Sequence, residues 1–178
     1  MPPQPLQGEW EVRPLDSHHD RAAFSCGDDR ISDFLKKHAS QSMKRKTAVI
    51  WILSKKGENK TLGFYSLSNT LIDVGTLPAE IIKKIKFDKA GATLLGQFGI
   101  DESVQNCGYG RLLHMHALRK AWMASKDVAS VGVILDARTD AAKKFWNKCE
   151  YIALPETSDG SQKFFLPMTY IEDLFKET

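Results

Sequence analysis

The chain has 178 residues, of which 42% are hydrophobic and 26% charged, and its formal net charge is +3. These values are typical of a globular protein that can bury one sizeable core. The three cysteines are widely spaced, which argues against a disulfide scaffold and indicates reduced thiols in a cytoplasmic protein. We expect no signal peptide in MPPQPLQGEWEV and no membrane span, because no run approaches the roughly 18 apolar residues that a spanning helix needs.

The first part of the chain predicts a strand, a helix and a hairpin. Ile31, Phe34 and Leu35 recur at helical spacing after a capping aspartate. A continuous β-branched and aromatic run, TAVIWIL, then predicts a buried strand, and a polar turn joins it to a partner strand. The predicted bounds are Trp10–Pro14 for the first strand, Asp28 or Asp29 to about Met43 for the helix, 47–53 and 61–71 for the hairpin strands, and 55–60 for the turn.

The second part predicts a central strand, a long helix and further strands. We expect one mixed sheet with helices on both faces, an α/β or α+β fold in a single domain over 1–178. Trp51, Phe87 and Trp122 are expected in the core. The predicted bounds are a short helix over 77–85, a turn over 88–92, the central strand over 94–100, a helix after residue 110 to about 123, a strand over 130–135, a helix over 141–149, strands over 151–154 and 163–167, and a terminal helix over 170–175.

A hexapeptide, Gln105-Asn106-Cys107-Gly108-Tyr109-Gly110, connects the central strand to the long helix. The first turn of a helix leaves backbone N–H groups without partners and carries partial positive charge, so glycines there favour binding of a phosphate or pyrophosphate. The spacing fits neither a P-loop nor a dinucleotide fingerprint. The alternative is a tight strand-to-helix turn that needs glycine for its own conformation.

The hexapeptide resembles motif A of the GNAT superfamily, the GCN5-related N-acetyltransferases. That motif is Gln/Arg-x-x-Gly-x-Gly/Ala, and Gln105, Gly108 and Gly110 match its defined positions. Further segments are similar to the acetyltransferase toxins of bacterial type II toxin–antitoxin systems. They are Phe24-Ser25-Cys26-Gly27, Gly63-Phe64-Tyr65-Ser66-Leu67-Ser68, and Asp136-Ala137 with Ala141-Ala142 followed by Phe145-Trp146.

This resemblance implies the GNAT fold, a central mixed and mostly antiparallel sheet with helices on both faces, and transfer of an acetyl group from acetyl-CoA to a primary amine. In the toxin branch the acceptor is the α-amino group of an aminoacyl-tRNA, and the result is blocked translation. The alternatives are an acetyltransferase of a small amine or a protein amine, and a catalytically silent CoA-binding regulator. The toxin resemblance also implies a ribbon-helix-helix antitoxin and a homodimer as partners.

The resemblance further implies which residues hold acetyl-CoA. The pantetheine arm would pair with the backbone of the central strand, and the pyrophosphate would lie on the N–H groups of the hexapeptide, with Arg111 close enough to help. The implied cofactor-binding residues are Phe98, Gly99, Ile100, Gln105, Asn106, Cys107, Gly108, Tyr109, Gly110, Arg111, Asp136, Thr139 and Phe145.

One departure from the family concerns the general acid. The family usually has a tyrosine where this chain has Trp146, and an indole N–H cannot release a proton at useful pH. The Phe-Gly-Phe that usually follows in the family is Cys149-Glu150-Tyr151 here. Three alternatives remain: transfer proceeds without a side-chain acid, Tyr151, Tyr109 or Cys149 replaces it, or the protein binds CoA without catalysis. Positioning an amine against a thioester supplies much of the rate enhancement.

Basic residues form two groups, one around the end of the first helix and one over 83–89. The first group predicts a grip on the phosphate backbone of tRNA, and the alternative is a solvated face beside a core strand. No metal site is expected, because the histidines lack partner clusters. The predicted substrate residues are Lys36, Lys44, Arg45, Lys46 and, on the hairpin, Ser66.

Overall fold

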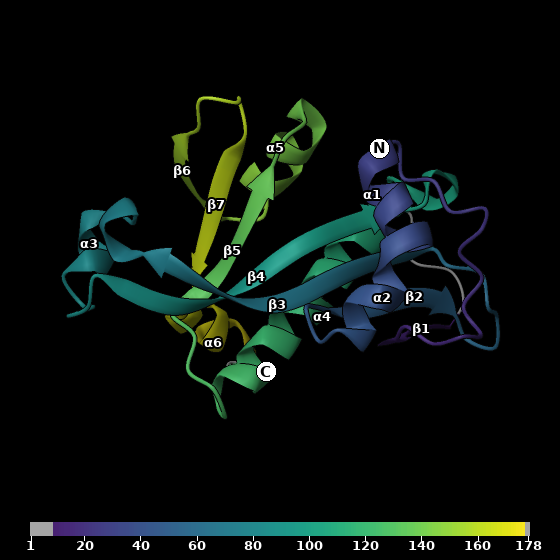
Figure 1. Cartoon of the computed structure of the whole chain (residues 1–178), viewed down its shortest axis with the longest axis horizontal. Helices are drawn as coiled ribbons and strands as arrows, with labels where there is room; N and C mark the ends of the chain where they lie inside the picture. The colour runs from purple at the N-terminus through teal and green to yellow at the C-terminus, as the bar shows by residue number, and fades with distance from the viewer. Residues whose placement is uncertain (1–8, 177–178) are drawn as a thin grey trace. The chain divides into compact units, whose positions relative to one another are not determined.

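A computed structural model describes residues 9–176 as seven strands, helices and short helical turns (Figure 1). The strands are β1 (Trp10–Pro14), β2 (Val49–Lys55), β3 (Gly63–Asp73), β4 (Lys89–Ile100), β5 (Gly132–Ala137), β6 (Ile152–Glu156) and β7 (Gln162–Pro167). The helical elements are α1 (Asp29–Asp33), η1 (Phe34–His38), α2 (Ala39–Lys44), η2 (Val74–Thr76), α3 (Ala79–Ile82), η3 (Glu102–Val104), α4 (Tyr109–Ser125), α5 (Asp140–Asn147) and α6 (Met168–Lys176).

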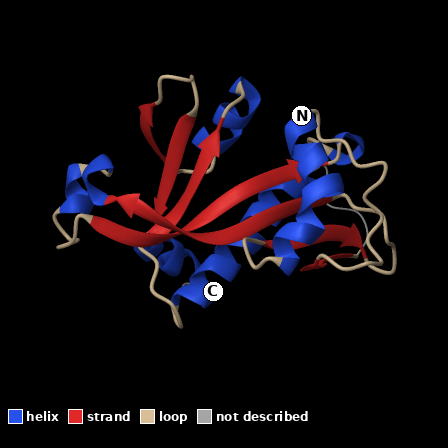
Figure 2. Ribbon diagram, viewed as in Figure 1, coloured by secondary structure: helices blue, strands red, loops and turns tan. Residues whose placement is uncertain are grey.

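The strands form one sheet in the order β1-β2-β3-β4-β5-β7-β6 (Figure 2). Pairings β1–β2, β2–β3, β5–β7 and β6–β7 are antiparallel, whereas β4 pairs with β5 in parallel. The parallel pairing joins Thr93 with Val133 and Leu94 with Ile134. This mixed, mostly antiparallel sheet confirms the predicted fold class.

The chain divides into two compact units, one of Met1–Ser68 with Leu95–Ala117 and the other of Asn69–Leu94 with Leu118–Thr178. In the first unit, Leu35 of η1 lies in one core cluster with Ile52 and Phe64. The next residue along β3, Tyr65, bonds through its hydroxyl to His116 Nδ1 of α4 at 2.9 Å. Because neighbouring strand residues point to opposite faces, helices cover both faces of the sheet here.

The second unit has its own core, which joins the sheet to the segment around α3. Ile72, Ala92, Ile134 and Phe165 are buried there, and the isoleucines of the α3 segment pack against them. Gly132 is required in this core, since an added Cβ would lie 2.4 Å from the carbonyl oxygen of Leu166.

Several predicted bounds differ from the observed ones. Of the region 88–92, predicted as a turn, residues 89–92 belong to β4, and the helix predicted over 77–85 is reduced to α3. The long helix begins at Tyr109, inside the hexapeptide rather than after it. The predicted first helix is interrupted by the π-helical segment η1. Local propensity did not reveal these ends, which depend on packing.

Phe87 was predicted in the core, but its side chain is 76% exposed. Its segment turns Ile81, Ile82 and Ile85 toward the core instead. Within residues 9–176, no helix is long and apolar enough to cross a membrane.

Candidate functional site

The predicted site residues divide between the two units: the β4–α4 loop (residues 101–108) lies in the first, and α5 with its following turn lies in the second. Asp101 begins the loop and is only 6% exposed. Its carboxylate accepts hydrogen bonds from the backbone N–H groups of Ser25 and Ser103, both at 3.1 Å, and from the Ser103 hydroxyl. Burial raises the pKa of Asp101, but the bonds from Ser103 and Ser25 outweigh it and hold the pKa below the usual value.

Gln105 fixes the loop rather than facing outward as a free donor. Its side-chain amide donates to the carbonyl oxygens of Cys26 at 3.0 Å and Ile100 at 2.9 Å. Glu102 adds a bond from the Ser25 hydroxyl at 2.9 Å. The Phe-Ser-Cys-Gly segment is therefore tied to the end of β4 through side chains of the loop.

The loop reaches α4 through two residues in the left-handed region. Asn106 has a φ of 59° and Gly108 a φ of 87°. Asparagine and glycine adopt this conformation most readily, so the hexapeptide suits the turn. Helix α4 then begins at the buried Tyr109, and its first backbone N–H groups are those that a helix leaves without internal partners. The arrangement of a left-handed glycine before a 17-residue helix fits an anionic group.

Two of the predicted cofactor residues of β4, Gly99 and Ile100, have no side chain free to reach a ligand. A Cβ on Gly99 would lie 3.1 Å from Ile31 Cγ2 and 3.2 Å from Cys26 Sγ, so the glycine permits close packing of the first helical segment. Ile100 is 9% exposed and lies against Gly63. Only the backbone of these residues is suited to pair with a ligand.

Ser66, a predicted substrate residue, is buried with 4% exposure. Its hydroxyl oxygen accepts a hydrogen bond from the backbone N–H of Gln97 at 2.8 Å. The Ser66 side chain thus accepts a hydrogen bond from a backbone N–H group of β4. Its role toward a substrate stays a prediction.

In the second unit, Thr139 begins α5. Its hydroxyl oxygen accepts a bond from the Ala142 N–H at 3.1 Å, the usual bond of an N-cap threonine. Asp136 at the end of β5 is exposed, and Arg138 lies 4.0 Å from its carboxylate.

Trp146 lies at the end of α5 and is 5% exposed. Its ring makes edge contacts with Phe145, with centroids 4.7 Å apart, and with Tyr151, with centroids 5.5 Å apart. Burial, with a smaller contribution from Cys149, raises the pKa of the Tyr151 phenol, which weakens it as an acid. Glu150, which lies between Cys149 and Tyr151 in the sequence, has a φ of 63°, a left-handed conformation, at the position where the family has glycine.

The predicted tRNA residues Lys36, Lys44, Arg45 and Lys46 are all exposed. Among the described residues, no carboxylate lies within ion-pair distance of them, although the neighbouring Lys37 pairs with Asp33 at 3.0 Å. Their charge is available to an anionic partner.

Sequence reasoning missed the carboxylates that hold the loop. Asp101 and Glu102 are visible in the sequence as an acidic turn after a strand, but their partner Ser25 lies 76 residues away from Asp101. The available signal in the sequence was an aspartate, Asp101, two residues before Ser103, because an aspartate side chain often accepts a hydrogen bond from the backbone N–H two residues further on. Within residues 9–176, no group of three or more His, Cys, Asp or Glu side chains is arranged to hold a metal.

No protein-family model matches the chain. The probable toxin TacT of Sinorhizobium fredii is 24% identical over 92% of this chain and 93% of its own length. The tRNA-acetylating toxin of Mycobacterium tuberculosis is 22% identical over 79% of this chain and 83% of its own length.

Two solved proteins are similar over 94% of the chain. A tyrosine-to-phenylalanine variant of KacT has 30% identity and a TM-score of 0.87, with 99% of its chain covered. AtaT in complex with acetyl-methionyl-tRNAfMet has 28% identity and a TM-score of 0.85, also with 99% covered. Another AtaT structure, 26% identical with a TM-score of 0.78 and 99% covered, contains the C-terminus of the antitoxin AtaR and acetyl-CoA.

Proposed function

Because the chain belongs to the GNAT-fold acetyltransferase toxins of toxin–antitoxin systems, we propose that it transfers the acetyl group of acetyl-CoA to the α-amino group of an aminoacyl-tRNA and so blocks translation. The observation that carries the proposal is the β4–α4 loop, in which left-handed Asn106 and Gly108 precede the start of α4. AtaT, a relative of the same fold, is known in complex with an acetylated aminoacyl-tRNA.

Residues of the first unit would hold the nucleotide end of acetyl-CoA. The N–H groups from Asn106 to Gly110 suit the pyrophosphate, and the exposed Arg111 adds positive charge in the first turn of α4. Cys107 is half-buried within the same loop. Gln105 acts as a positioning residue, since both of its bonds go to backbone carbonyls of the protein.

The backbone of Phe98, Gly99 and Ile100 would pair with the amide groups of pantetheine. The residues of β4 that pair with β5 are Thr93 and Leu94, and both come before residues 98–100 in the strand. In the second unit, the residues proposed to contact acetyl-CoA are Asp136, Thr139 and Phe145. Thr139 also caps the N-terminus of α5.

The reaction needs an unprotonated amine and a way to return a proton to sulfur. The nitrogen attacks the acetyl carbon, the C–S bond breaks, and the proton lost by the nitrogen reaches the departing sulfur through solvent. A free α-amino group has a reference pKa of about 7.7–8.0, so a substantial fraction is unprotonated near neutral pH without a strong base.

No side-chain acid is needed in this scheme. Trp146 cannot supply a proton, and the raised pKa of Tyr151 makes its phenol a weaker acid than an ordinary tyrosine. Tyr109 is buried at the start of α4. Acid catalysis is typically worth about 10²–10⁴-fold, so its absence slows transfer without abolishing it.

We further propose that the two units act as one domain over 1–178, because β3, β4 and α4 each begin in one unit and continue into the other. The exposed Lys36, Lys44, Arg45 and Lys46, with Ser66, are proposed to serve the tRNA substrate. A homodimer in the cytoplasm, neutralised by a ribbon-helix-helix antitoxin, is the proposed biological form, and the AtaT complex with AtaR supports an antitoxin partner.

The test is a single-turnover assay with acetyl-CoA labelled in the acetyl group. Charged tRNA is the substrate and deacylated tRNA the matched control, and label is expected on the charged form alone. Label on a polyamine or a lysine peptide instead would favour the small-amine or protein-amine alternative. Intact acetyl-CoA binding with no transfer to any amine would identify a silent regulator.

A further inference from the structure

The segment between α3 and β4 has an apolar inner side and a basic, aromatic outer side. Ile81, Ile82 and Ile85 pack against the core of the second unit. Phe87 faces outward with 76% of its side chain exposed, the largest exposed fraction among the described large hydrophobic residues. An exposed phenylalanine gains nothing from the core, so its position is informative.

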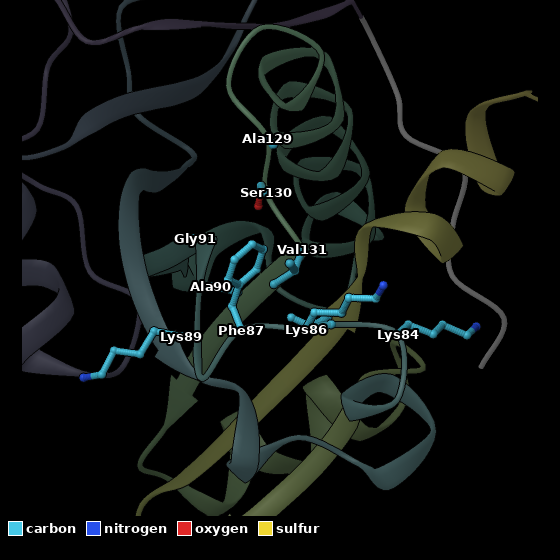
Figure 3. A pocket seen from close by; sticks show the side chains of 10 residues that line it. Lys84, Lys86, Phe87, Lys89, Ala90, Gly91, Ala129, Ser130 and Val131 are labelled. Carbon is cyan, nitrogen blue, oxygen red and sulfur yellow. The ribbon is translucent and has the colours of Figure 1, made fainter.

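Phe87 borders a hollow of about 590 Å³ between this segment and the residues that lead into β5. Ala129, Ser130 and Val131 form its opposite wall. Figure 3 shows the Phe87 ring over the hollow, with Lys89 extending to one side and Lys84 and Lys86 to the other. The ring and the ammonium groups therefore frame one open site within a single unit.

The wall of the hollow is fixed by hydrogen bonds. The Ser130 hydroxyl lies 3.0 Å from the Thr93 hydroxyl and donates to the carbonyl oxygen of Gly132 at 3.0 Å. The backbone N–H of Val131 donates to the carbonyl oxygen of Gly91 at 2.9 Å. A ligand would meet a preformed surface.

The charge of the site is positive. Carboxylates in the same region are Asp88, on the segment itself, Glu80 on α3, Asp127 before the wall residue Ala129, and Asp73, which lies 3.5 Å from Lys89 Nζ. Both partners of that pair are more than half exposed, so the pair is weak and Lys89 can exchange it for a stronger anion. Three lysines around an aromatic ring match the phosphates and the base of a nucleotide.

We infer that Phe87 and its lysines form a nucleic-acid binding site, at which an unpaired base of the tRNA stacks on the Phe87 ring while Lys84, Lys86 and Lys89 contact the flanking phosphates. This inference rests on the proposed function for the identity of the nucleic acid. It adds a second contact region to the basic residues near α2. An acidic polypeptide would satisfy the lysines, but it would leave the open aromatic face without a planar partner.

The test measures binding of fluorescent tRNA to the full chain by anisotropy over a range of salt concentrations. Phe87→Ala is expected to weaken binding about 5- to 150-fold, because stacking of one base on an aromatic ring is worth about 1–3 kcal/mol. Phe87→Trp should retain binding, whereas Phe87→Leu, which keeps apolar area without an aromatic face, should behave like Phe87→Ala. The double variant Lys84→Gln/Lys86→Gln should lower the slope of log affinity against log salt by about 0.7–0.9 per lysine.

The matched control is Lys55→Gln/Lys56→Gln, which removes the same charge at the exposed turn after β2 and should change the slope less. A single-stranded RNA oligonucleotide should compete with tRNA and a blunt duplex should not, because a duplex offers no free base. The inference would be overturned if Phe87→Ala bound tRNA with unchanged affinity. It would also be overturned if polyglutamate competed in a way that depends on Phe87 while the binding of tRNA did not depend on Phe87.

The binding assay also separates this inference from the proposed function. Loss of tRNA affinity in Phe87→Ala in a protein that acetylates no charged tRNA would support the site and contradict the activity. Normal affinity in Phe87→Ala in a protein that acetylates charged tRNA would contradict the site and leave the activity supported.

Discussion

The β4–α4 loop of the first unit and the turn after α5 (residues 148–151) of the second are both short connections, yet they are built differently. The loop matches motif A at every defined position and places its left-handed backbone on Asn106 and Gly108. The turn departs from the family at Glu150 and Tyr151, as the preceding helix does at Trp146, and Glu150 holds a left-handed conformation that favours glycine.

The two regions are also held by different forces. Hydrogen bonds to Asp101 and from Gln105 anchor the loop, whereas aromatic rings in edge-on contact fill the region of Trp146 and Tyr151. From this difference we expect binding of acetyl-CoA to follow the family pattern and proton transfer to the leaving group to depart from it. Affinity and turnover should therefore respond to different substitutions.

Gly108→Val should have the largest effect, a loss of acetyl-CoA affinity of at least about a hundredfold. A β-branched residue in the left-handed region is strained by about 1–2 kcal/mol, and its side chain would also cover the N–H groups of the loop. Isothermal titration calorimetry measures the affinity. Gly57→Val is the matched control, because Gly57 has a φ of 80° and no atom within 4 Å of an added Cβ, so it carries the strain alone.

Equal affinities in Gly57→Val and Gly108→Val would contradict the assignment of the loop to the pyrophosphate. A lower free energy of unfolding in both variants, with lost affinity in only one, is the expected pattern.

Trp146→Tyr should raise turnover about 10- to 100-fold at saturating acetyl-CoA, which is at or below the lower end of the roughly 10²–10⁴-fold that a general acid typically contributes. Acetyl-CoA affinity should stay close to that of the unmodified protein. Its pH–rate profile should gain a descending limb above pH 10, because burial at this position raises the pKa of the new tyrosine above its reference value of about 10. Tyr151→Phe is the companion variant and should leave turnover nearly unchanged, because burial has already raised the pKa of that phenol.

A tenfold or larger loss of turnover in Tyr151→Phe would instead identify Tyr151 as the replacement acid. That outcome would unite the two departures, since the hydroxyl missing at position 146 would then act from the ring beside it.

Sequence patterns predicted the elements that depend on short-range periodicity. The order of strands and helices, the hairpin and the hexapeptide before α4 all follow from local spacing. The start of β4 at Lys89 did not, because residues 88–92 look polar and turn-like until Ala92 is packed against Ile134 in the second core.

Roles that depend on distant partners could not be predicted. Gln105 matches motif A, but its bond to Cys26 spans 79 residues and is visible only in the folded chain. The same applies to Phe87, whose aromatic character predicts burial although the adjacent isoleucines occupy the core. The contacts of these side chains within each unit follow from the folded chain and not from periodicity.

Asp101→Asn should lower the free energy of unfolding by about 1–3 kcal/mol at neutral pH, because two backbone N–H groups lose a charged acceptor. The folded-state pKa of Asp101 is below its unfolded value, so the carboxylate stabilises the fold above the unfolded pKa, near 4, and the stabilisation is lost as pH falls through the folded pKa. Urea titrations at pH 7 and pH 3 should show a gap between the two proteins that narrows at low pH. A gap that is constant with pH would mean that the charge of Asp101 does not contribute.

Glu150→Gly should have the smallest effect, an increase in the free energy of unfolding of up to about 1 kcal/mol. Glycine removes the strain of the left-handed backbone, which costs a non-glycine residue about 1–2 kcal/mol. The substitution also removes the exposed hydrogen bond from the Tyr170 hydroxyl to Glu150, which offsets part of this gain. Glu150→Ala loses the same bond and keeps the strain, so it should be less stable than the unmodified protein. The difference in unfolding free energy between the two variants isolates the backbone contribution. If they are equally stable, the turn after α5 carries no strain, and its departure from the family affects only the chemistry of Trp146 and Tyr151.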